Sequence, residues 1–286
     1  MTLHRSLRDL RAHKDARVLT EDQLRRVVPS IFAEEAHGSR SDRYTYIPTI
    51  NVMHGLAKEG FLPVVARQSS PRDDTRRDFT KHMIRFRRPD QKYGAVGDVL
   101  PELVLVNSHD GTSSYNLMAG LFRLACMNGL VVDAGEIASI RVPHKGDIVS
   151  QVIEGAYTVL NESVRALEAP REWSTLQLSS PERMILAEAA HTLRFADAEG
   201  EITTAIKPQQ LLIPRRYDDK NNDLWQTFNV VQENVIRGGL SAMGRDANNR
   251  PRRSTSRAVN GIDQDVKLNK ALWTLASKMA ELKKAA

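Results

Sequence analysis

The 286-residue chain is 41% hydrophobic, enough apolar material for a sizeable core in one large domain or in a domain with appendages. It carries 41 Lys and Arg against 35 Asp and Glu, a net charge of +6, and this basic excess favours a polyanionic partner such as nucleic acid. The single cysteine excludes an internal disulfide and a cysteine-based zinc cluster. No apolar run of membrane-spanning length is present, so we expect a cytoplasmic protein without a membrane partner.

Two helices are expected before the first strand. Thr20 and Gln23 have capping-box spacing, which predicts a helix from Thr20 to about Ala36. Thr49 is expected to cap a second, short helix that ends at Gly60. Apolar and β-branched segments separated by turn residues then predict an antiparallel meander over 61–68, 79–88, 101–108, 115–127, 130–132 and 138–143.

The apolar period then changes from two residues to 3.6. Residues 144–168 are predicted to form a long amphipathic helix that covers one face of the sheet. Further helices are expected from a Ser180 cap, over 222–237 and over 263–284; the last has a leucine spacing that fits packing on its own domain or pairing with a partner helix. The polar segment 241–261 lacks periodicity and is predicted to be a mobile loop.

These elements predict an α+β fold, in which an antiparallel β-meander with a long helix packed on it is followed by a helical C-terminal part. The expected domains are an N-terminal helical arm at 1–40, an α+β core at 41–175 and a helical part at 176–286 that includes the basic loop at 241–261.

Basic residues concentrate in two places. Alternation along the strand at 79–87 puts Lys81, Arg85 and Arg87 on one face and apolar residues with His82 on the other, so a basic sheet face is expected. The loop 241–261 holds five arginines against one aspartate. Together they suit a protein that follows a phosphate backbone, although each alone also fits an ordinary solvated surface. The candidate nucleic-acid-binding residues are Arg67, Arg76, Arg77, Lys81, Arg85, Arg87, Arg88, Arg123, Arg245, Arg250, Arg252, Arg253 and Arg257.

The stretch NSHDGTSSYNLMAGLFRLACMNGLVV at 107–132 raises the question of catalysis. It holds a His-Asp pair, hydroxyl side chains and the only cysteine, but the chain has no GxSxG, HExxH, P-loop or GxGxxG motif. Asp110 before a glycine is first of all a hairpin signal, and Arg123 amid apolar neighbours needs an ion-pair partner or a ligand. We therefore assign no catalytic residue, metal ligand or cofactor and favour a binding protein over an enzyme.

The same stretch, with its HDG turn, FRxxC and NGL, resembles a phage- and plasmid-related family filed as a domain of unknown function. So do RRYDDKNNDLWQTFNVVQENVIRGG and AVNGIDQDVKLNKALWTLA, and the resemblance runs from about residue 40 onward. It implies carriage on mobile elements and no particular chemistry. The order of helix, antiparallel strands and long helix is similar to the core of single-strand annealing recombinases of the Red-beta and RecT type, which assemble into rings or filaments around a basic DNA-binding groove.

The function expected from these observations is DNA binding for a mobile element. The specific hypothesis is single-strand annealing or homologous recombination by a non-catalytic homo-oligomer that binds single-stranded DNA and the annealed duplex. The alternative is an interaction protein that counters host defence or regulates replication, with a host single-strand-binding or defence protein as its partner. A third hypothesis is a metal-dependent nuclease built from carboxylates distant in sequence.

Overall fold

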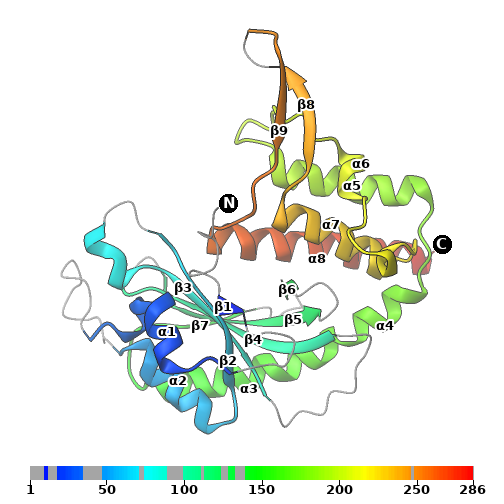
Figure 1. Ribbon diagram of the computed structural model, residues 1–286. Helices are drawn as coiled ribbons and strands as arrows, with labels where there is room; N and C mark the ends of the chain where they lie inside the picture. Colours follow the sequence, from blue (N-terminus) through cyan, green and yellow to red (C-terminus); the bar gives the residue numbers. More distant parts are fainter. Residues whose placement is uncertain are drawn as a thin grey trace. The chain divides into compact units, whose positions relative to one another are not determined.

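The structure is a computed structural model that describes residues 10–11, 18–34, 47–70, 74–88, 99–110, 113–123, 128–132, 139–245 and 248–285, without the side chains of 10, 11, 74–76, 128 and 162–165. The chain forms two compact units, Met1–Leu167 and Glu168–Ala286 (Figure 1). The boundary precedes the one expected at 175, because α4 (Glu168–Thr175) packs Trp173 against Trp225 and Phe228 of the second unit.

An antiparallel sheet is the centre of the first unit, which confirms the predicted meander. Among the described residues it has seven strands in the order β1 to β6, while β7 pairs with the first half of β5. The strands are β1 (Leu10–Arg11), β2 (Leu62–Gln68), β3 (His82–Arg87), β4 (Val99–Asn107), β5 (Tyr115–Arg123), β6 (Asn128–Val131) and β7 (Ser139–Val142).

The predicted long helix is present as α3 (Ile148–Ala166) and covers one face of the sheet (Figure 1). Its approach is close: a Cβ built on Gly155 would lie 2.7 Å from Leu117 Cδ1 of β5. The helix starts at Ile148 rather than 144. Since strand side chains alternate between faces, the residues of β3 that point toward α3 are His82, Ile84 and Phe86.

The N-terminal capping box is confirmed, but the helix that it starts is shorter than expected. α1 spans Glu21–Val27 with Thr20 as N-cap, and a 3-10 turn, η1 (Pro29–Phe32), follows. Pro29 ends the helix because a proline has no N–H to donate and disfavours helical backbone at the residue before it. The remaining short elements of this unit are α2 (Thr49–Lys58), which ends before Gly60 at φ +84°, and η2 (Asp74–Phe79).

Thr49 was expected to cap α2, but it does not. Its side chain is instead buried in a polar network. Pro48 takes the N-cap position. The Thr49 hydroxyl lies 3.0 Å from His82 Nε2 and 2.9 Å from His109 Nε2, and it accepts a 3.2 Å hydrogen bond from Asn107 Nδ2. The network thus ties the start of α2 to β3 and to the end of β4.

The hydrogen-bond partners assign the protons of this network. His82 Nδ1 lies 3.2 Å from the Thr80 carbonyl, which can only accept, so Nδ1 carries the proton and Nε2 accepts from Thr49. The Thr49 hydroxyl has one proton, so His109 Nε2–H must donate to Thr49. Burial lowers the pKa of His82 to about 4 and that of His109 to about 2, which keeps both rings neutral.

The sheet face opposite α3 contains a buried ion triad. Glu102 of β4, 1% exposed, accepts from Arg85 Nε at 2.5 Å and from Arg87 Nε at 2.7 Å. Arg85 Nη2 donates to the Leu130 carbonyl at 2.6 Å. Burying a carboxylate is tolerated only when opposite charges and hydrogen bonds replace its water, and two guanidiniums supply both here.

A glycine provides the space for this triad. A Cβ on Gly129 of β6 would lie 2.3 Å from Arg85 Nη1 and 2.5 Å from Arg85 Cζ. The NGL motif therefore has a structural cause, because only glycine lets the guanidinium cross β6.

The second unit is a helical assembly around all three tryptophans of the chain. Trp173, Trp225 and Trp273 pack together with Phe228. The predicted C-terminal helix buries Leu268, Leu272 and Met279, and its packing on its own unit is confirmed. The elements of the second unit are α4, α5 (Ser180–Phe195), α6 (Pro208–Leu211), η3 (Tyr217–Asp219), α7 (Leu224–Arg237), β8 (Ser241–Arg245), β9 (Pro251–Thr255) and α8 (Ile262–Ala285). The cap of α5 is Ser179, one residue before the expected Ser180.

Acidification is expected to destabilise the first unit through its buried histidines. The pKa values of His82 and His109 in the folded state lie below the ordinary value near 6.5. As pH falls below 6.5, the unfolded state therefore binds more protons than the folded state, and stability decreases. Each histidine should cost roughly 2 kcal/mol of unfolding free energy between pH 8 and pH 5. Urea unfolding followed by far-UV circular dichroism at both pH values measures this loss.

The variant for that experiment is His82→Gln, which should shrink the loss relative to the wild type. Equal pH dependence in wild type and His82→Gln would contradict the assignment.

Gly129→Ala is expected to destabilise the protein by about 2–4 kcal/mol, because the new methyl group displaces the Arg85 guanidinium from its buried partners. Thermal and urea unfolding of Gly129→Ala, Arg85→Met and the double variant measure the effect. The double variant should lose less than the sum of the single variants, since the methyl group then meets no guanidinium. Additive losses would show that Arg85 is not what makes glycine necessary.

Candidate nucleic-acid interface

The segment expected to be a mobile loop is a β-hairpin, so that prediction is wrong. β8 and β9 pair in antiparallel register, with Ser241 opposite Thr255 and Arg245 opposite Pro251. The pattern missed the hairpin because its residues show no apolar alternation. One of its faces approaches the rest of the unit closely, because a Cβ on Gly244 would lie 2.9 Å from Ala205 Cβ.

Arginines occupy the hairpin from its turn to its base, and all five are exposed. Arg245 and Arg253 share one face with Met243, which is 66% exposed. Arg252 is adjacent to Arg253 and therefore points to the other face. Arg250 precedes β9, and Arg257 follows it. Figure 1 shows the hairpin extending away from the helices of its unit.

The positive charge of the second unit is concentrated in this hairpin. Residues 241–257 contain five arginines and one aspartate, a local charge of +4. The rest of Glu168–Ala286 contains 13 Lys and Arg against 14 Asp and Glu. The hairpin is thus a local positive feature on a nearly neutral unit.

The base of the hairpin is fixed to the end of α7. Gly239 N donates to the Ser256 carbonyl at 2.7 Å. Gly238 has φ +61°, and a Cβ there would lie 2.5 Å from the Arg257 carbonyl, so glycine is required at this crossing. Arg194 of α5 bridges the two sides by donating to the carbonyls of Val235 and Arg257 at 3.2 Å and 2.9 Å. Burial lowers the pKa of Arg194 below its usual value.

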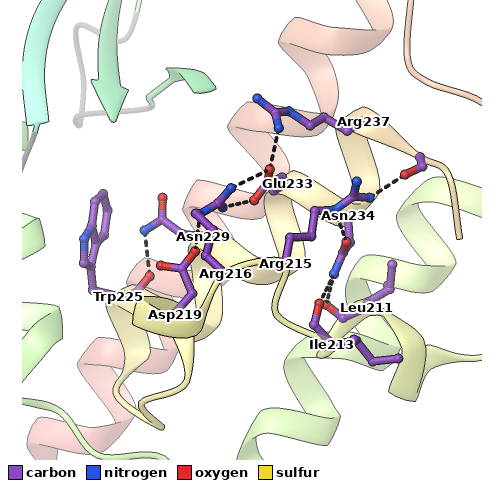
Figure 2. Close-up of polar contacts among 11 residues, drawn as sticks. Leu211, Ile213, Arg215, Arg216, Asp219, Trp225, Asn229, Glu233, Asn234 and Arg237 are labelled. Atoms are coloured by element: carbon purple, nitrogen blue, oxygen red, sulfur yellow. Dashed lines mark hydrogen bonds and ion pairs between the residues drawn. The ribbon is translucent and has the colours of Figure 1, made fainter. Parts of the chain in front are cut away.

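A second polar cluster holds the same end of α7 (Figure 2). Arg215 donates to Asn234 Oδ1 at 2.8 Å and to the Gly238 carbonyl, and the Asn234 amide donates to the carbonyls of Leu211 and Ile213 at 3.0 Å and 2.9 Å. The hairpin therefore continues from a helix end whose position is set by the side chains of Arg194, Arg215 and Asn234.

Glu233 is the centre of the neighbouring ion-pair network in Figure 2. Its side chain is 1% exposed and accepts from Arg216 and, at 2.7 Å, from Arg237. Arg216 also pairs with Asp219 at 2.8 Å. These arginines come from the RRYDD and VIRGG motifs, and they are structural partners of α7 rather than part of the exposed basic surface.

The prediction of an open, basic sheet face is wrong, because the arginines on that face are buried. Arg85 and Arg87 are 4% and 8% exposed and are held by Glu102, and Arg123 is 7% exposed. The alternation predicted correctly which residues share a face. It did not reveal that this face is buried, because both faces of β3, β4 and β5 are covered.

The other candidates of the first unit are scattered. Arg67 and Lys81 are half-buried, and the half-buried Arg88 lies with its Cζ 5.4 Å from the Phe61 ring centre. Arg77 is exposed in η2, and the side chain of Arg76 lies outside the described residues. Of the predicted set, the structure gathers Arg245, Arg250, Arg252, Arg253 and Arg257 on one element.

The stretch considered for catalysis is mainly structural. His109 is fully buried in the Thr49 network, Ser113 Oγ donates to the Ser114 carbonyl, and Cys126 lies outside the described residues. Within the described part of the chain, no three His, Cys, Asp or Glu side chains are arranged to hold a metal ion.

No described helix is both long and apolar enough to cross a bilayer.

Comparison with known proteins identifies relatives along nearly the whole chain. It is 52% identical over 261 residues to UPF0380 protein YafZ and 51% identical over 261 residues to UPF0380 protein YfjQ, both of Escherichia coli strain K12. Each alignment covers 91% of this chain and 91% of the relative. No solved structure matches the chain. The family model described as "Domain of unknown function (DUF932)" matches residues 36–273, and the chain therefore belongs to that family.

Proposed function

We propose that this chain is a DNA-binding protein that holds the phosphate backbone through the β8–β9 hairpin. The observation that carries the proposal is the set of five exposed arginines on one projecting element. A guanidinium offers a planar pair of donors that matches phosphate oxygens, and each neutralised phosphate releases counterions.

The mounting of the hairpin supports the same function. Its base is held by Arg194, Arg215 and the glycine pair at 238–239, so the arginines start from a fixed backbone. Binding then costs less conformational entropy than it would for an unstructured loop.

We extend the proposal to annealing of complementary strands by a homo-oligomer. Its support is the element order of the first unit, in which α2, an antiparallel sheet and α3 follow one another as in annealing recombinases. The triad of Arg85, Glu102 and Arg87 would stabilise this sheet and leave DNA contact to the hairpin.

Replacement of Arg245, Arg252 and Arg253 by Gln should weaken DNA binding at least tenfold and reduce the salt slope by about three counterions. The variant should keep its circular dichroism and tryptophan fluorescence, since these side chains are exposed. Fluorescence anisotropy with labelled DNA over a sodium chloride series provides the affinities.

The control removes the same charge from exposed residues of the same unit, through Arg171→Gln, Lys220→Gln and Lys267→Gln. It should lose far less affinity than the hairpin variant. Equal losses in both variants would show that the hairpin contributes only through the net charge of the protein. If the wild type does not bind DNA at low salt, an acidic protein becomes the partner to test.

Annealing is expected to accelerate when the protein is added to complementary fluorescent strands, with large assemblies visible by mass photometry in the same samples. The hairpin variant should assemble but lose the acceleration. DNA binding by a monomer that leaves the annealing rate unchanged would remove this extension and keep the DNA-binding proposal.

A further inference from the structure

We infer that the β8–β9 hairpin binds in the major groove of duplex DNA, the product of annealing, in preference to a single strand. This inference rests on the proposed function and names the form of DNA that the hairpin recognises. It is carried by the shape of the hairpin, the directions of its arginines and the side chains on its outward face.

The hairpin has the dimensions of a groove ligand. Two paired strands lie about 4.8 Å apart, and with side chains they approach the roughly 12 Å width of the B-DNA major groove, which admits a two-stranded ribbon. Each strand contains five residues, which gives a length of about 17 Å.

The positive charge reaches both ends of the ribbon. Arg245 and Arg253 lie on the face that would enter the groove, whereas Arg252 lies on the face with Gly244, which approaches Ala205. A ribbon in a groove has a phosphate backbone along each of its two edges, whereas a single strand offers only one. Arg250 and Arg257 extend the positive charge beyond the two ends of β9.

The outward face has groups that suit base edges. Met243 is 66% exposed and directly opposite Arg253 in the register. An apolar side chain can contact a thymine methyl group, and an arginine can pair with guanine O6 and N7 in the major groove.

The hairpin lacks what a single-strand site normally uses. No Phe, Tyr or Trp occurs between residues 238 and 261, so no aromatic ring is present for base stacking. Strand addition by another protein is also disfavoured, because β9 begins at Pro251, which cannot donate a ladder hydrogen bond, and is rich in arginine.

The test compares three labelled ligands of one sequence, namely duplex DNA, single-stranded DNA and duplex RNA, by anisotropy with the full chain. Duplex DNA should bind roughly tenfold more tightly than the other two, because the A-form major groove is too narrow for a ribbon. Dimethyl sulfate footprinting should show protection of guanine N7 in the duplex, and Arg253→Lys should reduce that protection while it preserves the salt slope.

Each outcome separates the two proposals. Tighter binding to the single strand, equal binding to duplex RNA, or unprotected guanine N7 would overturn the groove inference, and hairpin-dependent binding in those cases would preserve the proposed function. If the wild type binds none of the three ligands at low salt, both fall.

Discussion

A buried glutamate held between two arginines recurs in both units, and the tertiary structure of each depends on it. In the first unit, Glu102 lies between Arg85 and Arg87 across β3 and β4. In the second, Glu233 of α7 lies between Arg216 and Arg237. Loss of one partner from a buried ion pair leaves a charge without solvent, which is far more costly than loss of a surface pair. These clusters therefore fix the position of strands and helices more strongly than exposed charges do.

The described basic residues of the chain are therefore of two kinds. One kind pairs with internal carboxylates or donates hydrogen bonds to carbonyl groups, and it includes residues in the motifs that define the family resemblance. The other kind remains exposed, and the densest group among the described residues is the hairpin. Net charge gives no sign of this division, because a guanidinium inside a triad and one on a ribbon count equally toward +6. What matters for a polyanion is the charge that stays in solvent.

The hairpin and the helical body of its unit are linked by backbone geometry as much as by charge. Gly238 places the chain where a side chain would collide with Arg257, and Arg194 and Arg215 then bind carbonyls on both sides of this crossing. A ribbon mounted in this way presents its arginines in a constant direction, which is what recognition of a regular groove requires. The unit around Trp173 serves as the scaffold for that element.

The sequence by itself determined the α+β class, the meander, the long helix and most helix ends, because these follow from local periodicity, caps and glycine positions. The Thr20 capping box and the stop at Gly238 are of this kind. Only the tertiary structure decided that Thr49 serves a histidine network, that Gly129 makes room for Arg85, and that the polar segment after α7 pairs with itself. The physical reason is that burial, ion pairing and strand register are set by residues distant in sequence, whereas alternation shows only which side chains share a face.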